Sequence, residues 1–136
     1  MISEATQVAP DLVENYISTL AQYGAYDETG VWRVAFSPEW VAAQDQVATW
    51  CEEAGLAWRR DAAGNVWGRL EGTEDGPVIA TGSHIDSQTP GGRFDGALGV
   101  VAAIEVAART DVALAVVAFR DEERSCAGSH ACVEAS

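Results

Sequence analysis

One histidine and several carboxylates follow two apolar segments of the chain. His84 and Asp86 come just after one segment, and Glu122 and Glu123 come just after the other. A neutral imidazole and carboxylates are ligands that proteins use to bind zinc and similar divalent cations. A carboxylate in such a site can also take the proton of an attacking water. These residue types therefore predict a metal site with a general base.

The spacing of His84 and Asp86 allows the two side chains to act together. On an extended backbone, residues two positions apart share a face. The Asp86 carboxylate could then accept the second ring N–H of His84, which fixes the tautomer and makes the ligating nitrogen more basic. The alternative is a loop histidine that makes only local contacts.

Asp95 follows Gly91 and Gly92 and comes two residues before an apolar segment with helical spacing. It could cap that helix, or its two oxygens could bridge a pair of cations. We favour the bridge, because a cap does not require the flanking glycines. Glu122 and Glu123 are expected on extended backbone and hence on opposite sides, one to bind metal and one to face water. The alternative for this pair is a solvated acidic strand end.

Composition limits the partners and the compartment. The formal net charge of −13 over 136 residues argues against nucleic acid and against anionic membrane surfaces. Three cysteines form no Cys-x-x-Cys motif, so we expect a reduced, cytoplasmic protein. The absence of lysine and of a G-x-G-x-x-G motif argues against a nucleotide-binding domain.

The apolar patterns predict an α/β fold in which helices cover a central, mostly parallel sheet, as a three-layer sandwich. In such sheets ligands bind beyond the carboxyl ends of the strands, which is where the motifs lie. The expected helices begin after Asp11, begin at Ser37 and cover 97–109, with a further helix at the end, and the expected strands cover 56–60, 65–70, 77–82 and 113–119.

These motifs resemble those of the M20-type metallo-amidohydrolases, in the branch of N-carbamoyl-L-amino acid hydrolases and allantoate amidohydrolases. The most specific segment is the run from Gly91 to Val100, and the Glu122-Glu123 pair alone is much less specific. The other shared segments are 33–37, Trp50, 54–56, 61–66, 82–87 and 119–123.

The resemblance implies a zinc-aminopeptidase-like catalytic domain that holds two divalent metal ions, with Zn²⁺ expected and Mn²⁺ or Co²⁺ also suitable. It implies that His84 binds one ion, that Asp95 bridges both and that Glu123 binds the second. Asp86 would orient His84, and Glu122 would be the general base. The substrate would be a small ureido or carbamoyl compound whose linear amide or ureido C–N bond is hydrolysed, with release of ammonia.

The resemblance also implies two further histidine ligands, and an insert domain that carries the dimer contact and a carboxylate-binding arginine. None of these has a counterpart in this sequence, so we expect residues 1–136 to be a partial catalytic domain. Alone it should have weak or no activity and should not form the family-type homodimer. Arg124 stands where the family commonly has glycine, so the resemblance does not define the shape of the pocket.

Two alternatives remain open at this point. One is a related M20 aminoacylase or peptidase, which assays on peptides and on N-carbamoyl amino acids would separate. The other is a non-catalytic remnant or interaction module, in which a Glu122→Gln substitution would change no measurable property.

Overall fold

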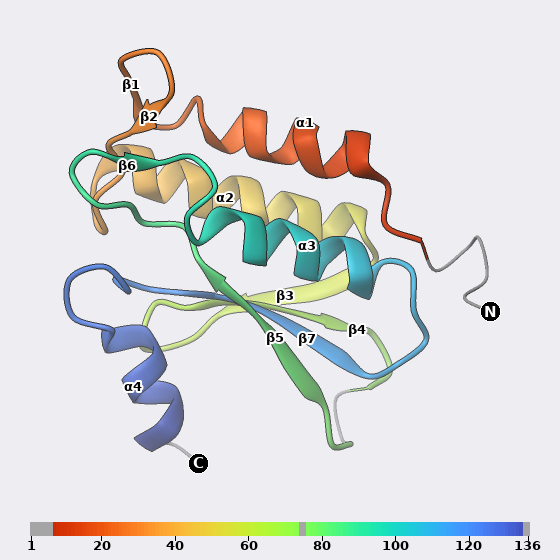
Figure 1. Cartoon of the computed structure of the whole chain (residues 1–136). Coiled ribbons are helices and arrows are strands. Elements are labelled where there is room, and N and C mark those ends of the chain that lie inside the picture. Colours follow the sequence, from red (N-terminus) through yellow and green to blue (C-terminus); the bar gives the residue numbers. More distant parts are fainter. Residues whose placement is uncertain (1–6, 74–75, 135–136) are drawn as a thin grey trace.

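A computed structural model describes residues 7–73 and 76–134, and its elements follow the apolar patterns of the sequence closely (Figure 1). In chain order they are α1 (Pro10–Leu20), β1 (Ala25–Tyr26), β2 (Gly30–Val31), α2 (Pro38–Glu53), β3 (Leu56–Arg60), β4 (Val66–Leu70), β5 (Ile79–His84), β6 (Gly91–Gly92), α3 (Ala97–Ala107), β7 (Leu114–Phe119) and α4 (Ala127–Glu134).

The start of α2 shows how local chemistry sets these bounds. The Ser37 hydroxyl accepts a hydrogen bond from the backbone N–H of Trp40 at 3.2 Å, and Pro38 occupies the first helical position. The helix ends before Gly55, whose φ of 77° is left-handed. The predicted start and end of this helix are therefore confirmed.

The main sheet has the strand order β3-β4-β7-β5, and its direction corrects the prediction of a mostly parallel sheet. Only β5 and β7 are parallel, whereas β3–β4 and β4–β7 are antiparallel. The tight turn between β3 and β4 forces the first reversal. In that turn the Asp61 carboxylate accepts hydrogen bonds from the backbone of Asn65 at 2.9 Å and from the indole of Trp67 at 2.8 Å. Within the described residues, the sheet is therefore mixed.

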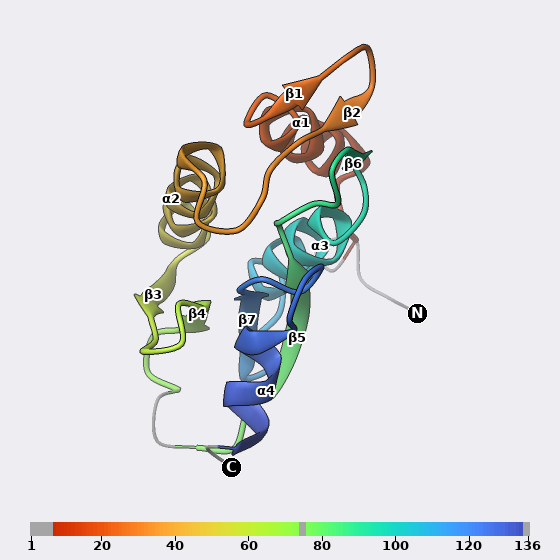
Figure 2. The same cartoon turned by 90° about the vertical axis from the view of Figure 1, so that its left-hand side faces the viewer.

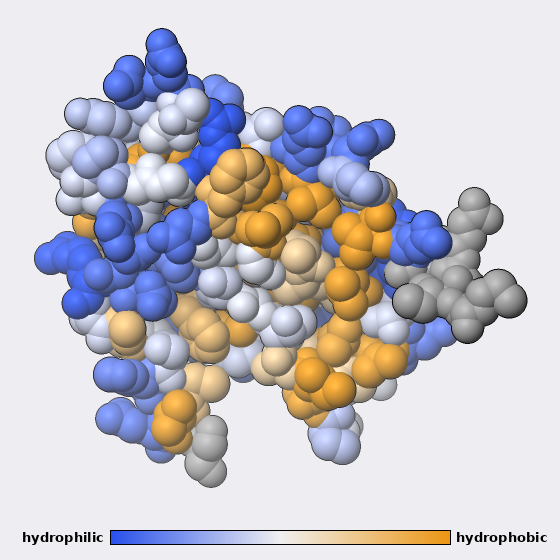
Figure 3. Space-filling model, viewed as in Figure 1, coloured by the Kyte–Doolittle hydropathy of each residue, from blue (hydrophilic) through white to orange (hydrophobic). Residues whose placement is uncertain are grey.

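Helices α2 and α3 cover one face of this sheet, α1 packs on α3 on the same side, and α4 lies on the other side near the end of β7 (Figures 1 and 2). The buried core lies between the three helices and the sheet, and the small sheet β1-β2-β6, which was not predicted, lies beside it. Strand β5 is an edge strand of the main sheet. Exposed apolar residues lie along α3 and at the start of β5 (Figure 3). They include Leu98 and Val106 of α3 and Ile79 of β5. No helix in the described ranges is both long and apolar enough to cross a membrane.

Arg33 ties α1 to the segment that follows β5. Its side chain is 2% exposed, and its guanidinium donates hydrogen bonds to the carbonyls of Leu20 at 2.6 Å, Tyr23 at 2.8 Å and Ile85 at 2.6 Å. Burial lowers the pKa of Arg33 to about 10, which still leaves the group charged at neutral pH. The backbone of Arg33 also exchanges two hydrogen bonds with Ser87, each 2.9 Å long.

We expect Arg33→Met to lower the free energy of unfolding by about 3 kcal/mol or more, because three buried carbonyls would lose charged donors. The control is Arg60→Met, which removes a solvent-exposed ion pair with Asp45 and should cost less than about 1 kcal/mol. Urea denaturation followed by tryptophan fluorescence measures both values. Equal losses in the two variants would show that Arg33 is not a structural tie.

Candidate metal centre

The candidate site lies where the parallel strands β5 and β7 end together. His84 pairs with Phe119, so the last residues of the two strands are neighbours. His84 is the final residue of β5 rather than two residues beyond it, because the pairing with β7 continues as far as the His84–Phe119 pair. Its side chain is buried, and its ring lies at the bottom of the site.

Glu122 and Glu123 reach the site from a turn, not from extended backbone as predicted. Asp121 takes a left-handed φ of 54°, and its carbonyl accepts the backbone N–H groups of Ser125 and Cys126. The chain therefore reverses directly after β7. This reversal brings both glutamates to the end of β5.

Three of the predicted metal-binding residues are neighbours in the structure. His84, Asp95 and Glu123 each offer a ligand atom, and these atoms lie within 4.8 Å of one another. The Nε2 atom of His84 is 3.8 Å from Oδ1 of Asp95. Glu122 is the fourth group, with its Oε2 atom 3.4 Å from the same nitrogen. One imidazole and two carboxylates at this separation are a donor set suited to a divalent cation.

Asp86 contacts both His84 and the backbone of the two glutamates. Its carboxylate is 1% exposed and accepts the backbone N–H groups of Glu122 at 3.2 Å and Glu123 at 3.1 Å. The Nδ1 atom of His84 is 2.9 Å from the Asp86 carbonyl and 3.5 Å from its carboxylate. The closer contact with His84 is therefore made by the backbone of Asp86. With its proton on Nδ1, the ring turns the lone pair of Nε2 toward Asp95 and Glu122.

The pKa shifts reflect these contacts. Burial alone would raise the pKa of Asp86, but the hydrogen bonds from His84 and from the backbone of Glu123 and Glu122 outweigh it and lower the pKa. Burial alone would lower the pKa of His84, but the hydrogen bonds and charge of Asp86 raise it above the ordinary value. Burial and the nearby Asp95 carboxylate raise the pKa of Glu123. The Asp95 and Glu123 carboxylates thus lie close together beside the His84 imidazole, an arrangement that favours binding of a cation.

Asp95 does not cap α3. The helix N-cap is Gly96, and no side chain makes a capping hydrogen bond there. The side chain of Asp95 is 57% exposed and lies on the His84 side of the turn. This geometry disfavours the capping alternative for Asp95.

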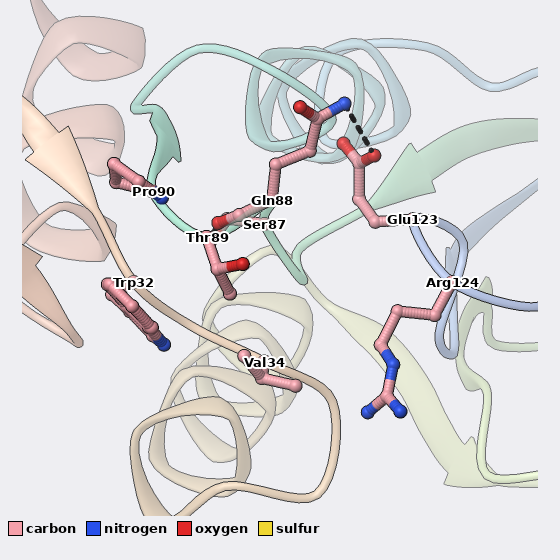
Figure 4. A pocket seen from close by; sticks show the side chains of 8 residues that line it. All are labelled: Trp32, Val34, Ser87, Gln88, Thr89, Pro90, Glu123 and Arg124. Atoms are coloured by element: carbon pink, nitrogen blue, oxygen red, sulfur yellow. Dashed lines mark hydrogen bonds between the residues drawn. The ribbon is translucent and has the colours of Figure 1, made fainter.

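A cavity of about 560 Å³ adjoins the metal centre (Figure 4). Trp32, Val34 and Pro90 form its apolar wall, and Glu123 and Arg124 are its charged residues. The remaining lining residues are Ser87, Gln88 and Thr89.

Sequence reasoning missed the part that Gln88 plays. Its side-chain amide donates a hydrogen bond to Oε2 of Glu123 at 3.2 Å, across a gap of 35 residues in sequence. Its position between the His84 motif and the Gly91-Gly92 pair was the only signal. His130, the other histidine, lies on α4 and is not part of the cluster.

Comparison with known proteins relates this site to amidohydrolases. The family model described as Peptidase family M28 matches residues 65–136. Allantoate amidohydrolase of Bacillus subtilis is 50% identical over 93 residues, which are 68% of this chain and 23% of that protein. N-carbamoyl-L-amino acid amidohydrolase of Geobacillus stearothermophilus is 46% identical over 112 residues, which are 76% of this chain and 27% of that protein.

A crystal structure of a hydantoinase/carbamoylase family amidase from Burkholderia phymatum superposes with a TM-score of 0.85 at 32% identity, covering 95% of this chain and 34% of that one. The chain thus spans about a quarter of the length of these two curated relatives. The sequence analysis named the family M20-type, whereas the family model that matches is described as M28. Both predicted branches, allantoate amidohydrolases and N-carbamoyl-L-amino acid hydrolases, are among the relatives found. The chain therefore belongs to peptidase family M28 and shares its fold with the hydantoinase/carbamoylase amidases.

Proposed function

We propose that the full-length protein containing this chain is a metal-dependent amidohydrolase that cleaves a linear amide or ureido C–N bond. The observation that carries this proposal is the cluster of His84, Asp95 and Glu123, with Glu122 3.4 Å from the histidine. The similarity to allantoate and N-carbamoyl-L-amino acid amidohydrolases indicates the substrate class, a small ureido or carbamoyl compound.

The donor atoms of His84, Asp95 and Glu123 suit divalent metal binding, and we propose that the full-length protein holds two such ions. We propose His84 as a ligand of one ion, Glu123 as a ligand of the other and Asp95 as a ligand shared by both. Burial and the neighbouring Asp95 carboxylate raise the pKa of Glu123, and a bound cation would relieve the repulsion between the two carboxylates, which supports this assignment. When bound, such ions would polarise the scissile carbonyl and make a water molecule more acidic.

The remaining residues position groups and move the proton. Glu122 is the proposed general base, because its carboxylate is partly exposed and lies beside the cluster, where it can take a proton from water. Asp86 is the proposed positioning residue, because it contacts both His84 and the backbone of the two glutamates.

The exposed apolar surface along α3 and β5 supports a further proposal about the fold. We propose that residues 1–136 are part of a larger three-layer sandwich, in which later residues of the full-length protein pack on this surface and supply the missing metal ligands.

The structure joins none of the three cysteines in a disulfide, which supports a reducing compartment such as the cytoplasm.

Gly96 packs directly against His84, which allows a test of the metal centre. A Cβ added at Gly96 would lie 2.5 Å from Cε1 of His84, and the φ of 68° disfavours any side chain. We expect Gly96→Ala to raise the dissociation constant for Zn²⁺ by about tenfold or more, because the ring would be displaced. Gly92→Ala is the matched control, since a Cβ there meets nothing within 4 Å. Competition with a chromophoric zinc chelator measures both constants, and equal affinities would argue against His84 as a ligand.

Glu122→Gln tests the general base. We expect kcat for ammonia release from an N-carbamoyl-L-amino acid or allantoate to fall by about 10²- to 10⁴-fold, with metal content unchanged. Glu14→Gln, on the exposed surface of α1, should leave kcat unchanged. A Glu122→Gln protein with full activity would remove Glu122 from the mechanism. Hydrolysis of dipeptides without hydrolysis of ureido compounds by the wild type would contradict the proposed substrate class.

A further inference from the structure

Every second residue from His84 to Gln88 contacts the turn that carries the two glutamates. The Nε2 atom of His84 is 3.4 Å from Oε2 of Glu122. The Asp86 carboxylate accepts the backbone N–H groups of both glutamates. The side-chain amide of Gln88 donates a hydrogen bond to Oε2 of Glu123 at 3.2 Å (Figure 4). Alternate residues share one face where a backbone is extended, and these three side chains reach the same turn.

Glu123 is therefore held at both ends, whereas Glu122 is held at one. Asp86 accepts the backbone N–H of each glutamate, but Gln88 donates only to the carboxylate of Glu123. In residues 7–73 and 76–134, no side-chain amide donates to the Glu122 carboxylate. This difference suits their proposed roles, since a metal ligand must be oriented by hydrogen bonds, whereas a general base must stay open to water.

The backbone next to Gln88 is fixed, although its side chain is exposed. Ser87 is 6% exposed and exchanges two hydrogen bonds with the backbone of Arg33, each 2.9 Å long. The Ser87 hydroxyl also donates to the Gln88 carbonyl at 2.8 Å. Gly91 packs on the other side, where an added Cβ would lie 3.1 Å from the backbone nitrogen of Gln88. The amide of Gln88 therefore extends toward Glu123 from a fixed point of the chain.

We propose that Gln88 is a positioning residue that holds Glu123 so that one of its oxygens is offered to a metal ion. This inference rests on the proposed function, since it takes Glu123 to be a metal ligand. The hydrogen bond from Gln88 occupies Oε2 and leaves Oε1 available for the cation. Hydrogen bonds from such outer residues orient ligating carboxylates and raise metal affinity.

The neutral charge of the Gln88 amide matters as much as its hydrogen bond. A lysine or arginine in this place could also donate to Glu123, but its positive charge would offset that of the carboxylate and repel a divalent cation. An amide donates without changing the charge of the site. A glutamine therefore orients the ligand and preserves its attraction for the ion.

Zinc binding by the full-length protein tests this inference without any measurement of turnover. We expect Gln88→Met, which keeps the length of the side chain and removes the donor, to raise the dissociation constant for Zn²⁺ by about tenfold. Gln88→Lys should raise it further, because it adds positive charge beside Glu123. Competition with a chromophoric zinc chelator measures these constants, and an unchanged urea midpoint shows that each variant is folded.

Gln22 provides the matched controls. Its side chain is exposed, and its amide donates only to the Ser18 carbonyl in α1, at 3.4 Å. Gln22→Met and Gln22→Lys should leave the dissociation constant for Zn²⁺ within about twofold, since salt screens a charge on the surface far from the site. An equal effect of lysine at positions 22 and 88 would show that only net charge is being measured, and would overturn the inference.

A double-mutant cycle shows whether Gln88 acts through Glu123. Glu123→Gln should weaken zinc binding by itself, and adding Gln88→Met to it should change the constant by less than about twofold more. If Gln88→Met instead weakens binding by the same factor with and without the Glu123 carboxylate, Gln88 does not position that carboxylate.

The inference and the proposed function can fail separately. If Glu123→Gln weakens zinc binding but Gln88→Met does not, the inference is wrong and the proposed function stands. If the zinc constants follow the expected order but the wild type hydrolyses no ureido or carbamoyl compound, the proposed reaction is wrong and the role of Gln88 stands. If Glu123→Gln leaves zinc binding unchanged, the assignment of Glu123 as a ligand and the inference are both overturned.

Discussion

The Asp86 carboxylate joins the ends of β5 and β7, and the geometry of the candidate metal centre depends on it. It accepts the backbone N–H groups of Glu122 and Glu123, while the Asp86 carbonyl lies 2.9 Å from Nδ1 of His84. One residue thus sets the position of two glutamates and the tautomer of the histidine. A buried carboxylate is stable only when such donors surround it. The Asp86 carboxylate and the turn that carries the two glutamates therefore stabilise each other.

Charge in the site is balanced only in part by the protein. Asp86 is compensated by its hydrogen bonds, and its pKa is lowered, whereas the pKa of Glu123 is raised beside Asp95. The first arrangement is a structural one and is complete without a ligand. The second leaves the negative charge of Glu123 facing the cavity.

The sequence predicted the elements that depend on local signals and missed those that depend on distant ones. Ser37 and Pro38 defined the start of α2, and β3 was predicted to the residue, because a capping motif and the turn signal at 61–64 are local properties. The direction of β4 against β7 could not be read, since that pairing joins residues some 50 positions apart. The turn at Asp121 was missed because it uses a left-handed φ without a glycine. The three candidate ligands, predicted from their residue types and motifs, nevertheless lie close together in the structure, and their role as ligands stays a prediction.

The pairing of β5 with β7 has a consequence for how this fold can change its length. His84 lies opposite Phe119 at the end of a ladder that begins at Ile79 and Leu114. Side chains alternate along a strand, so removal of one residue inside β5 would turn His84 to the opposite face of the sheet. An insertion in the connection 108–113 would leave the ladder, and therefore the site, in place. Natural insertions and deletions should accumulate in that connection, while both strands keep a fixed number of residues.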